Sequence, residues 1–119
     1  MPAVSARIEL VLDCRDPDRL VAFWCAALGY REFGRAGQYR SIVPDAGDSP
    51  KLIFQAVPET KAVKNRMHLD LIAGDIEAEA ERLLALGATR TSAEAISEHG
   101  ARWITMTDPE GNEFCICAA

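Results

Sequence analysis

The chain has 119 residues, of which 49% are apolar and 26% charged, and its formal net charge is −5. This length and composition predict one small globular domain with a single hydrophobic core. The acidic balance argues against nucleic acid and anionic membranes as partners, because both bind basic faces. No apolar run is long enough to span a bilayer and no signal peptide is recognisable, so we expect a cytoplasmic protein.

The first half of the chain opens with a predicted strand at residues 6–14, where apolar and polar side chains alternate. Asp16 is placed to cap a helix, Pro17 fits its first turn, and Gly29 is placed to end it. The apolar stripe of this helix is Leu20, Val21, Trp24 and Leu28. Three shorter strands are predicted to follow, at 30–34, 39–43 and 51–57.

After a connection at 58–65, the second half follows the same plan. Residues 66–72 alternate as a strand, Asp75 caps a helix, and Gly87 ends it. The stripe of the second helix is Ile76, Ala80, Leu83 and Leu84. Further strands are predicted at 88–91, 101–107 and 113–117. We interpret the segment 92–100 as a polar loop and 108–112 as a tight turn.

The two halves thus repeat one pattern, and Glu9 and His68 each stand seven residues before the capping Asp. An internal repeat of this kind sets the architecture. The sequence predicts an α+β fold of two tandem βαβββ modules, approximately 6–57 and 66–117, related by a pseudo-two-fold axis within one domain, 1–119. It also predicts that Glu9 and His68 lie close together on a concave face.

Alternation along the strands assigns side chains to two faces. One set is apolar and is expected to pack under the helices: Ile8, Leu10, Leu12, Met67, Leu69, Leu71, Phe114 and Ile116. The other set is rich in polar and ionisable groups: Arg7, Glu9, Gln55, Arg66, His68, Asp70 and Cys115. Buried polar and ionisable groups cost stability unless they form hydrogen bonds or contact water, so this face suggests a functional site. Trp103 either joins this face as a stacking surface or packs in the core.

Three segments resemble a known family: 16–24 (DPDRLVAFW), 68–71 (HLDL) and 108–114 (DPEGNEF). They are similar to the glyoxalase/bleomycin resistance/dioxygenase superfamily, also called the vicinal oxygen chelate fold, and to its small glyoxalase-like branch. The resemblance implies paired βαβββ modules that form a curved, cup-shaped mixed sheet around a divalent metal or a small ligand. It also implies a homodimer, which sedimentation at tens of micromolar protein would test.

The resemblance further implies metal ligands on the first, fourth, fifth and eighth strands of such a fold. The matching positions here are Glu9, Gln55, His68 and Cys115, and the last of these is usually a Glu in the family. Because a catalytic site wants about three suitable ligands, we expect no tightly held metal. If a metal does bind, the expected ligands are Glu9, His68 and Cys115.

Two functions remain open. The first is a metal-independent protein that binds a small organic molecule, with Gln55, Asp70, Trp103 and Cys115 in contact with the ligand. The second is a lyase, isomerase or dioxygenase in which Glu9 and His68 are catalytic, on a metal or as an acid–base pair. A nucleophilic Cys115 would need a lowered pKa, for which His68 is the only evident cause.

Overall fold

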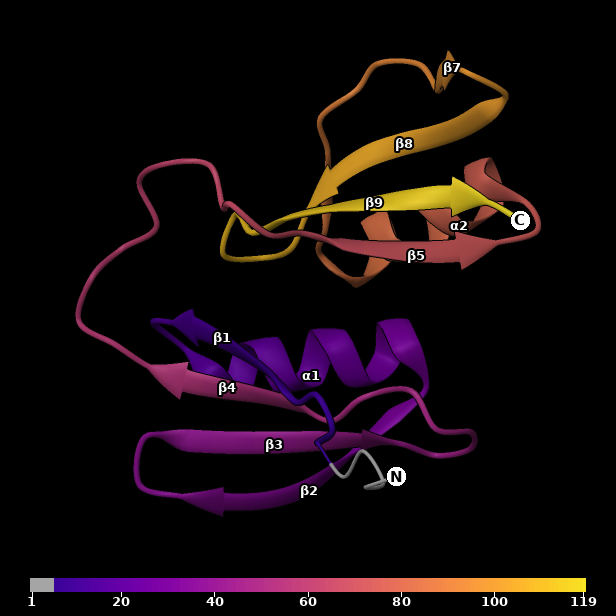
Figure 1. Ribbon diagram of the computed structural model, residues 1–119. Coiled ribbons are helices and arrows are strands. Elements are labelled where there is room, and N and C mark those ends of the chain that lie inside the picture. The colour runs from indigo at the N-terminus through magenta and orange to yellow at the C-terminus, as the bar shows by residue number, and fades with distance from the viewer. Residues whose placement is uncertain (1–5) are drawn as a thin grey trace. The chain divides into compact units, whose positions relative to one another are not determined.

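The computed structural model describes residues 6–119, which form an α+β structure with two mixed sheets (Figure 1). The chain divides into two compact units, the first ending at Glu59 and the second spanning Thr60–Ala119. The first unit contains β1 (Leu10–Cys14), α1 (Pro17–Leu28), β2 (Tyr30–Ala36), β3 (Tyr39–Pro44) and β4 (Leu52–Ala56). The second contains β5 (Leu69–Ala73), α2 (Ile76–Leu86), β6 (Thr89–Arg90), β7 (Ile96–Glu98), β8 (Ala101–Thr107) and β9 (Glu113–Ala118).

The two units share one topology. Their strand orders are β1-β4-β3-β2 and β5-β9-β8-β6, with the first strand of each unit parallel to the last and the other pairs antiparallel. The predicted βαβββ repeat is therefore present in both halves. The predicted pseudo-two-fold axis depends on how the units pack together, and it stays a prediction.

One strand was not predicted. Strand β7 lies in the segment 92–100, which we expected to be a loop, and it pairs with β8 through a hairpin. The two residues between the strands, His99 and Gly100, have φ angles of 52° and 80°. Two-residue hairpins favour positive φ at both central positions, because that backbone twist matches the twist of the flanking strands. Gly100 was the only sign of this hairpin in the sequence, because the residue before it is His99 instead of the usual Asn or Asp.

Both helices begin and end where the sequence predicted. The carboxylate Oδ1 of Asp16 accepts a hydrogen bond from Arg19 N at 3.2 Å, and that of Asp75 accepts one from Ala78 N at 3.1 Å. Each bond satisfies a donor that the first turn of a helix leaves without a partner. At the other ends Gly29 and Gly87 take left-handed conformations, with φ of 69° and 114°. These caps fix where the chain leaves each helix and returns to the sheet.

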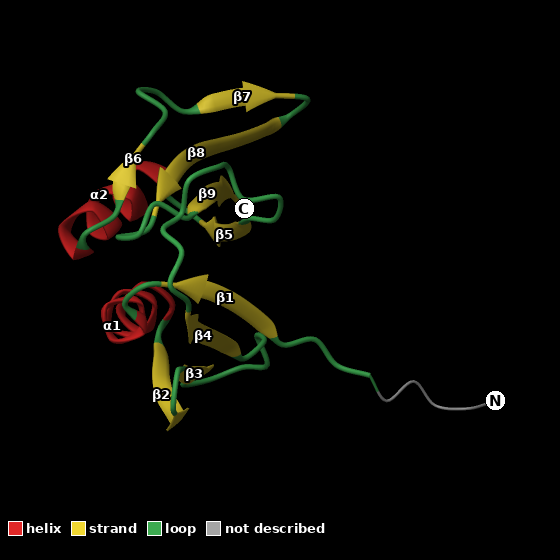
Figure 2. Cartoon of the chain, turned by 90° about the vertical axis from the view of Figure 1, so that its left-hand side faces the viewer, coloured by secondary structure: helices red, strands yellow, loops and turns green. Residues whose placement is uncertain are grey.

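Each helix covers one face of its own sheet, as Figure 2 shows for α1 and for α2 separately. The buried side of α1 consists of Leu20, Val21, Phe23, Trp24 and Ala27, and the rings of Phe23 and Trp24 meet edge to face at 5.0 Å. The buried side of α2 consists of Ile76, Ala80 and Leu83. Leu84 was predicted in this stripe, but it is 36% exposed, because Leu83 takes the inward position and the next residue rotates about 100° away.

Two residues predicted to pack under the helices do not. Ile8 is 75% exposed and Met67 is 69% exposed, because both precede the strands that were meant to hold them. The hydrogen bond from Leu10 N to Lys51 O lies at the start of the β1 ladder, and β5 begins only at Leu69. The other members of the predicted set follow the expected pattern: Phe114 and Ile116 are buried, and Leu10, Leu12, Leu69 and Leu71 are half-buried.

Strands β1 and β5 each end the strand order of their sheet, and each carries an exposed apolar side chain, Val11 at 56% and Ile72 at 67%. Edge strands with exposed apolar side chains are commonly covered by association with another protein chain. The homodimer stays a prediction, and sedimentation that shows a 13.0 kDa species at tens of micromolar protein would contradict it. Within residues 6–119, no helix has both the length and the apolar character needed to cross a membrane.

Candidate functional site

The second unit contains a hollow of about 630 Å³, formed by β5, β8, β9 and the residues that flank them. Its lining includes His68, Asp70, Trp103, Cys115 and Cys117. The sheet residues of this set alternate along β8 and β9 with the fully buried Ile104, Met106, Phe114 and Ile116. Because successive side chains of a strand point to opposite faces, the hollow lies on the face of the sheet away from the α2 core.

Strand register explains which side chains meet there. Asp70 on β5 stands opposite Cys115 on β9, and Cys115 stands opposite Thr105 on β8. Trp103 and Cys117 form the next opposed pair on the same face. Residues opposite one another in adjacent strands hold their side chains close together on one face. The face therefore presents a polar row that contains Asp70, Cys115 and Thr105, beside an indole and a thiol.

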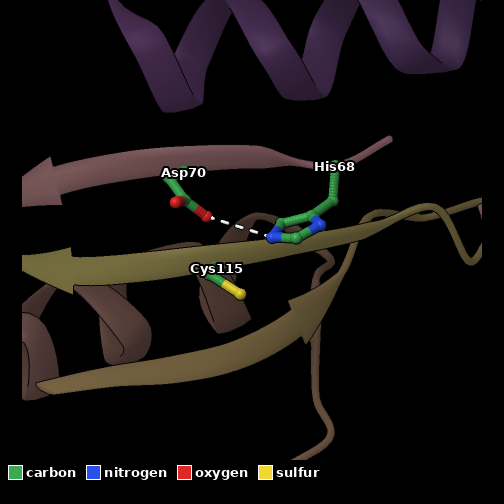
Figure 3. A group of neighbouring side chains, drawn as sticks. All are labelled: His68, Asp70 and Cys115. Atoms are coloured by element: carbon green, nitrogen blue, oxygen red, sulfur yellow. Dashed lines mark ion pairs between the residues drawn. The ribbon is translucent and has the colours of Figure 1, made fainter. Parts of the chain in front are cut away.

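The polar corner of the hollow consists of His68, Asp70 and Cys115, which we call the HDC group (Figure 3). One ligand atom from each residue lies within 4.8 Å of the other two, and His68 Nε2 lies 3.3 Å from Asp70 Oδ1. His68 stands immediately before β5, two residues from Asp70, so an extended chain puts both side chains on one side. The side chains of His68 and Asp70 are 41% and 53% exposed, so this corner is open to solvent.

The thiols of this face resist ionisation. Burial, and after it the negative charge of Asp70, raise the pKa of Cys115 to about 11. The same two causes raise the pKa of Cys117. A nucleophilic cysteine needs a lowered pKa, so the raised pKa argues against Cys115 as a nucleophile. Cys14, Cys25, Cys115 and Cys117 are present as thiols.

The other predicted site residues, Glu9 and Gln55, belong to the first unit. Glu9 precedes β1, and one of its carboxylate oxygens lies 3.4 Å from Lys51 Nζ, a partner that the sequence had not indicated. Gln55 lies on β4, in register with Asp13 and Tyr39. The closeness of Glu9 to His68, and the access of Gln55 to the hollow, stay predictions. Asp70 thus joins His68 and Cys115 in the HDC group, where the resemblance had suggested Glu9.

The turn between β8 and β9 is organised by a buried carboxylate. Asp108 is 2% exposed, and its Oδ1 accepts hydrogen bonds from the backbone N–H groups of Glu110 and Asn112, at 2.9 and 3.0 Å. The side-chain amide of Asn112 also donates to both carboxylate oxygens. Gly111 has a φ of 86°, which the turn requires. The predicted tight turn is present, and it places β9 beside β8 so that Cys115 faces the hollow.

Sequence reasoning missed the contacts that attach the connecting segment to β9. Lys61 Nζ donates to Glu113 Oε1 at 2.8 Å, and Asn65 N donates to Glu113 Oε2 at 3.1 Å. The amide of Asn65 also donates to Asn112 Oδ1 at 3.0 Å. Burial alone would raise the pKa of Glu113, but these hydrogen bonds outweigh it and lower the pKa to about 2. The segment lacks any periodicity, so nothing in the sequence pointed to its partners.

This arrangement predicts a pH-dependent contribution to stability. Because the pKa of Glu113 falls from 4.5 to about 2 on folding, its contribution is complete above pH 4.5 and is lost as the pH falls towards 2. We expect Glu113→Gln to lower the free energy of unfolding by about 1–3 kcal/mol at pH 7 and by much less at pH 2.5. Urea denaturation measures this difference, with the exposed Glu59→Gln as a control. A deficit that does not shrink in acid would contradict the prediction.

The family model for the glyoxalase-like domain matches residues 9–117. A glyoxalase/bleomycin resistance protein/dioxygenase family enzyme from Burkholderia phytofirmans PsJN has 20% identity and a TM-score of 0.77, with 92% of this chain and 95% of that chain covered. A member of the same superfamily from Sphaerobacter thermophilus has 18% identity and a TM-score of 0.70, with coverage of 96% and 98%. No curated protein matches the chain.

A third solved structure carries a ligand. A mutant of the fosfomycin resistance protein FosX from Listeria monocytogenes, complexed with Mn(II) and a dihydroxypropylphosphonic acid, has 14% identity and a TM-score of 0.77, with coverage of 97% and 90%. At such identities the likeness of the structures shows the fold, whereas the family model spans nearly all of both units. The chain belongs to the glyoxalase-like domain family, and it shares the fold of the two glyoxalase/bleomycin resistance/dioxygenase structures above.

Proposed function

We propose that this protein binds a small organic molecule in the hollow of the second unit, and that this binding requires no metal. The observation that carries the proposal is the hollow itself, of about 630 Å³, with the indole of Trp103 in its wall. This volume falls within the range of small-molecule sites, which combine an apolar wall with a few polar groups that fix orientation. Trp103 and Cys117 supply the wall, and His68 and Asp70 supply the polar groups.

The predicted chemistry of the ligand follows from these surroundings. A half-buried indole offers a flat apolar surface, which favours a planar or apolar ligand. The polar corner, where His68 lies 3.3 Å from Asp70, can both donate and accept hydrogen bonds. A ligand with an apolar ring and one polar substituent therefore fits best. We also propose Gln55 as a ligand contact, as the sequence predicted.

The binding of a small molecule is supported by the FosX structure, which holds a small organic acid together with Mn(II). We propose that the protein acts as a homodimer in the cytoplasm and binds neither nucleic acid nor membranes, in keeping with its net charge of −5.

The experiment is a thermal-shift screen of the protein against planar, mostly apolar compounds in the presence of EDTA. A ligand at 100 times its dissociation constant stabilises the folded state by about 2.7 kcal/mol. We expect hits whose stabilisation is the same with and without the chelator. Hits that stabilise the protein only when a divalent metal is supplied would overturn the metal-independent proposal.

A second candidate function is supported by the His68–Asp70 pair. A carboxylate beside an imidazole can fix the ring tautomer, and the imidazole can then act as a general acid or base in a lyase or isomerase. Asp70 here takes the role that the sequence assigned to Glu9. His68→Ala would abolish turnover and leave the free energy of unfolding nearly unchanged, because the ring is 41% exposed. Unchanged turnover in that variant would exclude this candidate.

A further inference from the structure

We propose that the HDC group is a zinc site contained within the second unit, in which the His68 imidazole, one Asp70 oxygen and the Cys115 sulfur are the three protein ligands. This goes beyond the proposed function, which needs no metal, and it departs from the expectation from the sequence that no metal is tightly held, because Asp70 supplies a third ligand. The site differs from the set suggested by the resemblance, because its carboxylate comes from Asp70 and not from the first unit.

The geometry of the group is close to that of a three-ligand site. Tetrahedral zinc with ligand bonds of about 2.0–2.3 Å holds its ligand atoms roughly 3.3–3.8 Å apart. The nitrogen of His68 and the oxygen of Asp70 are already 3.3 Å apart, and all three ligand atoms lie within 4.8 Å of one another. Small rotations of exposed side chains would close the remaining gap. Figure 3 shows the Cys115 sulfur on the same side as the His68 ring and the Asp70 carboxylate.

The strands hold the three residues in place before any metal arrives. Asp70 and Cys115 are fixed opposite one another by the parallel β5–β9 ladder, and His68 stands two residues from Asp70, immediately before β5. A site whose ligands stand on a rigid sheet has less conformational entropy to lose when the metal binds. The hollow beside the group leaves the fourth position of a tetrahedral ion open to water or to a ligand.

The chemistry of the donors selects the metal. One imidazole, one carboxylate and one thiolate form a mixed set that suits Zn²⁺ or Co²⁺, whereas Mn²⁺ favours oxygen ligands. The Mn(II) of the FosX structure is therefore a poor match to these residues. On binding, the Cys115 S–H bond breaks, a Zn–S bond forms, and the proton passes to solvent. Nothing is oxidised or reduced.

The test uses the full-length protein, stripped with EDTA in the presence of a non-thiol reductant and then freed of chelator. Zn²⁺ is titrated in competition with a fluorescent chelator, and Co²⁺ is titrated while its thiolate charge-transfer absorption is recorded. We expect one equivalent of each metal per chain and a sulfur-to-cobalt band. Cys115→Ser and Asp70→Asn should each weaken Zn²⁺ binding by at least about tenfold, and Cys115→Ser should abolish the band.

Cys117→Ser is the matched control, because Cys117 lies on the same face two residues along β9 but outside the HDC group. It should leave Zn²⁺ affinity and the cobalt band unchanged. Asp70 is exposed, so Asp70→Asn tests the site even if Cys115→Ser folds poorly. An absence of Zn²⁺ binding, or affinities that neither Cys115→Ser nor Asp70→Asn reduces, would overturn the proposal.

Selectivity provides a second readout. Zn²⁺ binds more tightly than Mn²⁺ at most protein sites, so the informative quantity is the change in their affinity ratio when the sulfur is replaced by oxygen. Cys115→Asp should lower the Zn²⁺/Mn²⁺ ratio by at least about tenfold. An unchanged ratio would show that the sulfur is not a ligand. These titrations contain none of the screened compounds, and the thermal-shift screen contains EDTA, so either proposal can fail without the other.

Discussion

Asp108→Ala should lower the free energy of unfolding by about 2–4 kcal/mol, because it leaves buried donors without acceptors. The carboxylate is 2% exposed and accepts from the backbone of Glu110 and Asn112 and from the Asn112 side chain. Alanine removes both acceptor oxygens and keeps the surrounding N–H groups buried. Urea denaturation of the variant and the wild type measures the loss.

The control for this prediction is Asp48→Ala, which removes an exposed carboxylate from a loop of the first unit and should change stability by less than about 0.5 kcal/mol. Asp108→Asn should fall between the two. Its carbonyl oxygen can still accept from the backbone, but its amide opposes the amide of Asn112. Equal stabilities for Asp108→Ala and Asp48→Ala would show that the turn does not depend on the buried carboxylate.

Trp103→Ala should weaken the binding of any compound found in the screen by at least about tenfold, because buried aromatic side chains carry much of the binding energy in ligand sites. Trp103 lies on β8 in register with Cys117, and both line the hollow. The indole is only half-buried, so its loss should cost less stability than the loss of a core tryptophan. Isothermal titration of wild type and variant in EDTA measures the change in affinity.

Tyr39→Ala is the matched control for Trp103→Ala. Tyr39 is an aromatic residue that is 40% exposed, and it lies on β3 of the first unit, outside the hollow. Its removal should leave ligand affinity unchanged. If the two variants lose affinity equally, or if Trp103→Ala binds as tightly as the wild type, the ligand does not sit against the indole.

Much of the fold could be predicted because local signals and the repeat agree. Asp16 and Asp75 cap their helices, Gly29 and Gly87 end them in left-handed conformations, and the same strand order recurs in both units. The two wrong burial predictions arose because alternation alone does not reveal where a strand begins. Ile8 and Met67 continue the apolar pattern of a strand, yet they lie beyond the last strand partner and remain exposed.

The candidate site could be predicted less completely. Alternation placed Asp70 and Cys115 on one face, but only the parallel register of β5 and β9 reveals that they are direct neighbours. The contact of the His68 ring, immediately before β5, with the Asp70 carboxylate two residues along the chain shows only in the structure. Contacts between an irregular segment and a strand, such as that of Lys61 with Glu113, depend on the folded path of the connection and leave no periodic signal.

The most direct test of the proposed function is to map a bound compound by amide chemical-shift perturbation, using the tightest hit of the screen in EDTA. We expect the largest shifts on the hollow of the second unit, at Trp103 including its indole N–H, Thr105, Cys115 and Cys117. Shifts confined to the first unit, or to the α2 face of the second sheet, would contradict it.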